Sequence, residues 1–263
     1  MKRIGIVGFG IMGEAFATGL GRKLPDVSLL AYDVRQDRVH SAAHGRQNLA
    51  VAESAADVFR GSDLTILCVK PQDFSALASQ VKEASRDHQV ISILAGRKIS
   101  AISDGLATDQ VARFMPNIAA TKGAALVGVS FHPNASPKLR EDALAIAAAL
   151  GTAMEIPEKL MSTITGVSGS GLAYVFQFVH AMAQGGVVAG FDYRTAVSIV
   201  CATMEGAIAL LKDGDNPVEL VSRVTSPAGT TIQGIRALEQ GRFTATVMEA
   251  VEASAHKATE FEG

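Results

Sequence analysis

The chain has 263 residues, of which 48% are hydrophobic and only 19% are charged, with a mean hydropathy of +0.23. Lysine and arginine number 24 against 26 aspartates and glutamates, so no basic excess predicts nucleic-acid binding. The apolar surplus also excludes a disordered chain. Since soluble domains carry about 25% charged residues, the shortage requires a membrane span, a large core or a buried subunit interface.

The shortage of charge is concentrated between Leu160 and Phe191, where no Asp, Glu, Lys or Arg occurs. Polar residues such as Ser168, Gln177 and His180 interrupt this segment, and no basic cluster flanks it. These features argue against a membrane span and favour a buried helix, in which His180 is expected to be a core residue. A two-domain chain of this length has little room for an oversized core, so we expect a second subunit to cover the helix.

The first half of the chain alternates apolar runs with helical patterns. The runs typical of buried strands are Arg3–Gly8, Ser28–Tyr32, Leu64–Val69, Val90–Leu94, Val111–Met115 and Ala124–Phe131. The helical patterns are Ile11–Arg22, Gln36–His44, Ser54–Arg60, Gln72–Ser85 and Pro137–Leu150. This alternation predicts an α/β domain with a mostly parallel, doubly wound sheet.

The second half shows helical patterns and no convincing strand after Glu158. The expected helices are Gly171–Ala189, Tyr193–Lys212, Pro217–Val224, Thr230–Gln240 and Thr244–Phe261. Turn signals separate them, including the glycine at position 241. We therefore predict a boundary near residues 156–162, with a dinucleotide-binding domain at 1–158 and an all-helical domain at 159–263.

A G-x-G-x-x-G motif directly follows the first expected strand and opens the first helix. Its six residues are Gly8, Phe9, Gly10, Ile11, Met12 and Gly13. The glycines permit a tight turn, a close approach of a pyrophosphate and close helix packing, and the helix N-terminus attracts phosphates. Asp33, at the end of the second strand, is placed to accept hydrogen bonds from a ribose. The alternative is a glycine-rich turn with a capping aspartate.

The same region gives conflicting signals about the cofactor. A carboxylate at Asp33 repels a 2′-phosphate and favours NADH, whereas Arg35 and Arg38 could bind that phosphate in NADPH. Either cofactor therefore remains open.

Two further strand ends are expected to face the cofactor, because ligands of open α/β sheets bind at the carboxyl ends of strands. The first comprises Cys68, Val69, Lys70 and Pro71, and the second contains Ala95. Lys70 could instead be a solvated lysine. Cys68 and Cys201 are expected to be buried free thiols in a reducing cytoplasm, and no His or Cys spacing predicts a metal site.

Two glycine-rich segments, 166–171 and 225–231, each open a helix in the second half. Their backbone N–H groups suit a substrate carboxylate, although each could be an ordinary helix cap. No lysine lies between Thr163 and His180 to act as the general base that alcohol oxidation requires. Imine reduction needs only a weak hydrogen-bond donor, and the hydroxyl of Thr231 would suffice.

Three motifs behind the glycine-rich turn resemble the pyrroline-5-carboxylate reductase family over essentially the whole chain. They are Met-Pro-Asn at 115–117, Gly-Ser-Gly-Leu-Ala-Tyr at 169–174 and Val-Thr-Ser-Pro-Ala-Gly-Thr-Thr at 224–231. The resemblance implies reduction of 1-pyrroline-5-carboxylate to L-proline by NADPH or NADH, the last step of proline biosynthesis. It also implies a Rossmann-like domain followed by a helical domain that interlocks two subunits. Such homodimers often assemble into rings, a decamer among them, and each active site lies between one subunit's Rossmann domain and its partner's helical domain.

The resemblance also assigns roles to single residues. Thr231 approaches the imine nitrogen, and backbone N–H groups of Ala228, Gly229 and Thr230 hold the substrate carboxylate. Ser226 and Lys70 are further substrate-binding candidates, and Asn117 is a cofactor-binding candidate alongside Val69, Lys70 and Pro71.

The sequence departs from the family pattern at three positions. Leu172 stands where proline is common, Ala228 where glycine is common, and Asp33 where a small polar residue usually favours NADPH. A methyl group at Ala228 would add strain if that residue adopts a positive φ.

Two other functions compete with imine reduction. One is a β-hydroxyacid dehydrogenase, disfavoured because Val175 occupies the position of the expected lysine. The other is a non-catalytic nucleotide-binding regulator on the same scaffold.

Overall fold

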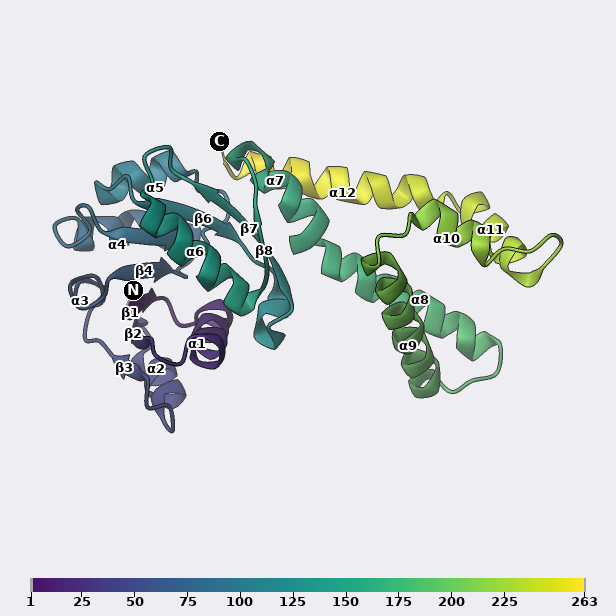
Figure 1. The fold of residues 1–263 in the computed structure, drawn as a ribbon, viewed down its shortest axis with the longest axis horizontal. Helices are drawn as coiled ribbons and strands as arrows, with labels where there is room; N and C mark the ends of the chain where they lie inside the picture. The colour runs from purple at the N-terminus through teal and green to yellow at the C-terminus, as the bar shows by residue number, and fades with distance from the viewer. Residues whose placement is uncertain (1, 263) are drawn as a thin grey trace. The chain divides into compact units, whose positions relative to one another are not determined.

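The computed structural model describes residues 2–262. It divides into two compact units: Met1–Gly169 with Ala253–Gly263 form unit 1, and Ser170–Glu252 form unit 2. The C-terminal end of the chain therefore packs with the N-terminal domain (Figure 1). The predicted boundary between a dinucleotide-binding domain and a helical domain, near residue 158, remains a prediction.

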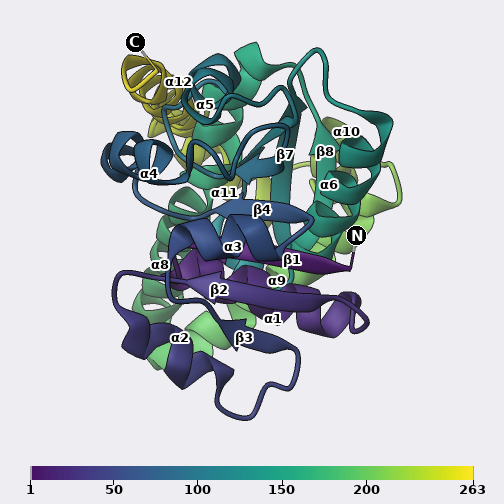
Figure 2. The ribbon, with the colours of Figure 1, turned by 90° about the vertical axis from the view of Figure 1, so that its left-hand side faces the viewer.

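Unit 1 contains one eight-stranded sheet with the order β3-β2-β1-β4-β5-β6-β7-β8 (Figure 2). Its strands are β1 (Arg3–Val7), β2 (Ser28–Tyr32), β3 (Leu49–Val51), β4 (Leu64–Leu67), β5 (Gln89–Ser92), β6 (Val111–Met115), β7 (Ala125–Phe131) and β8 (Gly151–Glu155). Only the β6–β7 pair is antiparallel. The predicted mostly parallel sheet is confirmed.

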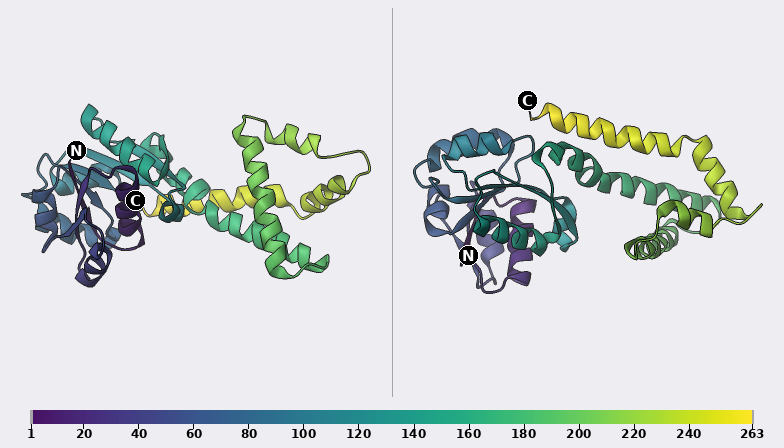
Figure 3. Two further views of the ribbon diagram at one scale, coloured as in Figure 1. Left: turned by 60° about the horizontal axis from the view of Figure 1, so that its bottom comes forward. Right: turned by 45° about the horizontal axis from the view of Figure 1, so that its top comes forward.

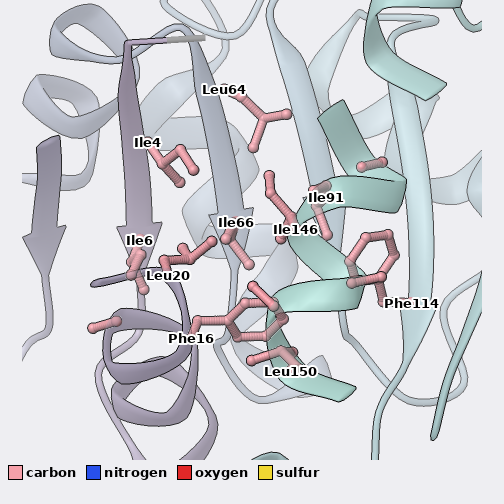
Figure 4. Close-up of a cluster of buried hydrophobic side chains, with 14 of the residues drawn as sticks. Ile4, Ile6, Phe16, Leu20, Leu64, Ile66, Ile91, Phe114, Ile146 and Leu150 are labelled. Atoms are coloured by element: carbon pink, nitrogen blue, oxygen red, sulfur yellow. The ribbon is translucent and has the colours of Figure 1, made fainter. Parts of the chain in front are cut away.

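Helices cover both faces of this sheet, as a doubly wound fold requires. The α-helices of its main body are α1 (Ile11–Lys23), α2 (Gln36–Ala43), α3 (Ala55–Gly61), α4 (Phe74–Val81), α5 (Ile99–Leu106), α6 (Pro137–Leu150) and α7 (Met161–Ile164). Side chains of α1 and α6, including Phe16, Leu20 and Ile146, pack on one face against Ile4 and Ile66 (Figure 4). The α3, α4 and α5 helices build a second buried cluster, so the central strands are apolar on both sides.

The sequence pattern missed β3, β8 and α5. The β3 strand has only three residues, too few to show a periodicity. The β8 strand begins at Gly151, directly after α6 ends, so no loop separates the two elements in the sequence. The α5 helix carries two serines and a glycine within eight residues, and these residues lower its helical signal.

Unit 2 consists of helices alone, as Figure 3 shows, and no strand occurs in the described chain after Glu155. The helices are α8 (Gly171–Val188), α9 (Tyr193–Lys212), α10 (Pro217–Arg223), α11 (Thr230–Gln240) and the first part of α12 (Phe243–Glu260). The predicted helices are therefore confirmed with small shifts at their ends.

The helices of unit 2 bury very little of their apolar surface within the chain. Ala183 is the only buried residue of α8, and α9 buries only Ala196 and Val200. Large side chains such as Phe176 and Val188 are 61% and 90% exposed. The α9 helix is also long and apolar enough to cross a membrane by length and composition, with a mean hydropathy of 1.5. Exposed patches of this kind are typical of surfaces that a partner covers.

Candidate active site

The glycine-rich turn between β1 and α1 lies against the end of β4. Gly8 has a φ of +93°, and a Cβ there would lie 2.6 Å from the carbonyl carbon and oxygen of Cys68. A Cβ on Gly13 would overlap the carbonyl oxygen of Gly8. By contrast, a Cβ on Gly10 would meet only Nη1 of Arg38, at 3.9 Å. Gly8 and Gly13 therefore close the turn, while Gly10 leaves space for a ligand.

A cleft of about 700 Å³ opens at the carboxyl ends of β1, β2 and β4. Because β1 pairs with β2 on one side and β4 on the other, this edge is the switch point at which open α/β sheets bind ligands. The predicted cofactor residues that line it are Gly8, Gly10, Asp33, Arg35, Cys68, Val69 and Lys70. Phe9 and Ile11 line a neighbouring hollow of about 580 Å³, to which Arg38, Ser41 and Arg46 also contribute.

The carboxylate of Asp33 is hydrogen-bonded within the chain. Its Oδ2 accepts from the backbone N–H of Phe9 at 2.6 Å, and its Oδ1 accepts from the N–H of Arg35 at 2.8 Å. The residue is buried, and Nη1 of Arg38 lies 4.0 Å from Oδ2. Asp33 thus joins the glycine-rich turn to the loop after β2, and Arg38 offsets its negative charge. Spacing alone predicted a ribose ligand and could not reveal these bonds.

Replacing Asp33 with alanine is expected to lower the free energy of unfolding by about 2–3 kcal/mol, because two N–H groups lose a charged acceptor. The variant should raise the KM for NADH and for NADPH by similar factors, since the turn serves both cofactors. Thermal unfolding and steady-state kinetics with each cofactor test this expectation. A rise in KM for NADH alone would instead assign Asp33 to the ribose.

The loop after β4 contributes the other wall of the cleft. Burial raises the pKa of the Cys68 thiol, which keeps it neutral and unreactive. Lys70 is exposed at the start of the short 3₁₀ turn Pro71–Asp73. Its ammonium group is therefore available to an anionic ligand in the cleft.

Five predicted cofactor residues do not line either hollow: Met12, Gly13, Pro71, Ala95 and Asn117. Asn117 uses its side chain inside unit 1, where Oδ1 accepts from the N–H of Ala119 and Nδ2 donates to Oγ of Ser168 at 2.9 Å. Pro71 is tied to the loop after β5, because its carbonyl oxygen accepts from Nη2 of Arg97.

In unit 2, residues 225–231, the threonine-rich segment, form a turn that leads into α11. The N–H of Gly229 donates to the carbonyl oxygen of Ser226 at 3.0 Å, and a Cβ on Gly229 would overlap Oγ of Ser226. The helix begins at Thr230 without a side-chain cap, so the N–H groups of its first turn have no intrahelical partner. The side chain of Thr231 is exposed beside them.

Ala228 has a φ of +57°, in the left-handed region, so the methyl group strains this turn as anticipated. Replacing Ala228 with glycine is expected to stabilise the protein by about 1 kcal/mol, the usual cost of a Cβ in this conformation. The matched control is Ala237→Gly in the interior of α11, which should destabilise by about the same amount. Thermal unfolding of both variants shows whether each substitution stabilises or destabilises the protein. A lower unfolding midpoint for Ala228→Gly would contradict the claim that the methyl group strains the turn.

Residues Thr165–Gly169 form a π-helical turn between α7 and α8, and α8 begins at Gly171 without a side-chain cap. The segment therefore opens a helix as expected, and its suitability for a carboxylate stays a prediction. One expectation about α8 was wrong. His180 is exposed in the single chain, where its Nδ1 lies 2.8 Å from the hydroxyl of Tyr193, so it is not a core residue.

Comparison with known proteins agrees with this geometry. Residues 158–261 match the family model described as pyrroline-5-carboxylate reductase dimerisation, and residues 3–96 match one described as NADP oxidoreductase, coenzyme F420-dependent. A pyrroline-5-carboxylate reductase from Methanosarcina acetivorans is 40% identical over 98% of this chain and 97% of its own length. The chain belongs to the pyrroline-5-carboxylate reductase family.

Solved structures extend the likeness to the whole fold. The crystal structure of Plasmodium falciparum pyrroline carboxylate reductase with NADP bound has a TM-score of 0.89 and 26% identity, covering 100% of this chain and 98% of that one. A 3-hydroxyisobutyrate dehydrogenase from Mycobacterium tuberculosis has a TM-score of only 0.53 and 14% identity, over 72% of this chain and 65% of its own. The family resemblance, the Rossmann-like fold and the oxidoreductase class are thus confirmed.

Proposed function

We propose that this member of the pyrroline-5-carboxylate reductase family reduces 1-pyrroline-5-carboxylate to L-proline with NADPH or NADH. The observation that carries the proposal is the pairing of two features in one chain. Unit 1 holds a glycine-lined cleft at the switch point of its sheet, and unit 2 presents the exposed Thr231 at an uncapped helix N-terminus. The first suits a dinucleotide and the second a small carboxylate with an adjacent nitrogen.

The residues of the cleft fit a nicotinamide dinucleotide. Gly10 leaves open the space that a side chain would fill, and the N-terminus of α1 directs its dipole toward it. Arg35 and Arg38 border the same cleft as Asp33, and Arg38 places a positive charge where a 2′-phosphate would bind. When bound, the reduced cofactor supplies the hydride that the imine carbon accepts.

The residues of unit 2 would orient the substrate. The unpaired N–H groups at the start of α11, from Thr230 onward, hold its carboxylate, with Ser226 and Ala228 completing the turn. The N–H of Gly229 already donates to Ser226, so its role is to let the turn close. Lys70 offers a positive charge from the cleft of unit 1.

The hydroxyl of Thr231 would donate a hydrogen bond to the substrate nitrogen. As hydride reaches the C=N carbon, the π electrons of that bond move to the nitrogen, which takes a proton from water and becomes a secondary amine. The charge of the nitrogen changes during this step, so a fixed donor beside it stabilises the transition state. A strong base is not required because the imine nitrogen is itself basic.

We further propose how the enzyme assembles and where in the cell it is located. The chain carries the family's dimerisation domain, and the exposed apolar faces of α8 and α9 suit a homodimer interface. We propose that the threonine-rich segment of one subunit serves the cofactor cleft of the other, that dimers associate further, with a decamer as one form, and that the enzyme is cytoplasmic.

An assay with both cofactors tests the activity. Purified protein should oxidise NADPH or NADH only when 1-pyrroline-5-carboxylate is present, and it should form L-proline in equal amount. Tight cofactor binding with no turnover would favour a nucleotide-binding regulator, and turnover with a β-hydroxyacid would favour a dehydrogenase.

A further inference from the structure

Arg113, in the middle of β6, carries a charge in the interior of unit 1 that the proposed reaction does not use. The residue is 1% exposed. Its Nη1 lies 3.2 Å from Oε1 of Glu158, and its Nη2 lies 2.5 Å from Oε1 of Glu262, the last residue that the structure describes. Burying such a group is costly unless it is paired, and buried ion pairs are weak evidence of stability. The cluster therefore needs another explanation.

The first partner connects the cluster to the start of α5. The same Oε1 atom of Glu158 accepts a hydrogen bond from the backbone N–H of Ile99 at 2.6 Å. Ile99 is the first residue of α5 and directly follows the loop after β5, which contains Ala95 and Gly96. Arg113 thus holds the side chain that fixes one end of this loop.

The second partner brings the C-terminus against the middle of the same loop. Gly96 has a φ of +68°, and a Cβ there would lie 2.6 Å from the carbonyl oxygen of Phe261 and 2.7 Å from its Cβ. Only glycine permits this close approach. The neighbouring Arg97 reaches the loop after β4 by donating from Nη2 to the carbonyl oxygen of Pro71 at 3.3 Å.

We propose that Arg113, Phe261 and Glu262 position the loop of residues 95–97 so that it can border the nicotinamide half of the cofactor. Arg113 fixes the loop through Glu158 on one side and through the C-terminal residues on the other. The three are positioning residues, since none of them lines the cleft. This inference rests on the proposed function and on the expectation from the sequence that Ala95, at the end of its strand, faces the cofactor.

The test compares three full-length variants. Glu262→Ala removes the carboxylate, Glu262→Gln keeps an oxygen that can accept from Arg113, and Glu260→Ala is the matched control. Glu260 lies on the last turn of α12 and pairs only with surface groups, His256 and Lys257. The measurements are the Kd for NADPH without substrate, the KM for each substrate, and hydrogen exchange of the peptide spanning residues 94–99.

Glu262→Ala should weaken NADPH binding by about tenfold, with faster exchange in residues 94–99 and an unchanged KM for 1-pyrroline-5-carboxylate. Glu262→Gln should recover most of the affinity, and Glu260→Ala should match the wild type. Wild-type affinity and exchange in Glu262→Ala would overturn the inference, as would an equal loss in Glu260→Ala. Because the Kd is measured without substrate, it remains informative even if wild-type turnover fails and the proposed reaction is wrong.

Discussion

Replacing Thr231 with alanine is expected to lower kcat by about 10- to 100-fold. The hydroxyl is proposed to donate a hydrogen bond to a nitrogen whose charge changes in the transition state, and such bonds contribute about 1.5–3 kcal/mol. The KM for NADPH should stay near the wild-type value, because the cleft of unit 1 is unaltered. Steady-state kinetics with both substrates varied provide the measurement.

The conservative variant separates chemistry from folding. Thr231→Ser keeps the hydroxyl and should retain most of the activity, whereas a general disturbance of the turn would affect both variants equally. If Thr231→Ala turned over as fast as the wild type, Thr231 would not be the donor. A rise in KM with kcat unchanged would assign the residue to substrate binding alone.

Replacing Phe176 with glutamate is expected to dissociate the dimer. Phe176 is 61% exposed in the single chain and lies on α8, which has no charged residue. A two-fold interface carries each substitution twice, and an unpaired buried charge costs several kcal/mol. The dimer dissociation constant should therefore rise by at least about 1,000-fold, and activity should fall with it if the site is shared between subunits.

Sedimentation velocity over a range of protein concentrations measures this effect. Phe176→Leu is the matched control, since it keeps an apolar side chain and should remain dimeric. A Phe176→Glu protein that sediments as the wild type does would show that this face of α8 lies outside the interface. A wild-type protein that stays monomeric and active at micromolar concentration would contradict the shared site altogether.

The elements that sequence reasoning located best are those with a local cause. The glycine spacing at 8–13 needs only a strand, a turn and a helix, and the turn forms as expected. The strain at Ala228 followed from one methyl group in a turn that favours glycine, and its φ of +57° agrees. Such features depend on a few neighbouring residues, so spacing and residue type reveal them.

The features that sequence reasoning missed depend on contacts between distant segments. The ribose role of Asp33 stays a prediction, and its hydrogen bonds to Phe9 and Arg35 could not be foreseen because they require the packed β1 and β2 loops. Arg113 is a single charged residue within an apolar run, and its partner Glu262 lies 149 positions away. No local pattern therefore indicates that the two residues pair. The antiparallel direction of β7 also depends on a contact between segments, because its pairing with β6 sets that direction and no local sequence pattern shows it.

The exposed apolar helices of unit 2 account for the chain's shortage of charged residues. The single chain contains a core on each face of its sheet, yet α8 to α12 bury only three residues of their own among those that the structure describes. The shortage of charge therefore belongs to a surface that a second subunit is expected to cover, since obligate interfaces resemble a core cut in half.

The most direct test of the proposed reaction follows the hydride itself. The protein would be incubated with NADPH carrying deuterium in the transferred position at C4 of the nicotinamide, together with 1-pyrroline-5-carboxylate, and the product analysed by mass spectrometry and NMR. We predict L-proline with one deuterium on C5, the former imine carbon, in equal amount to the NADP⁺ formed. Cofactor that remains reduced with both NADPH and NADH, or proline without the label, would contradict it.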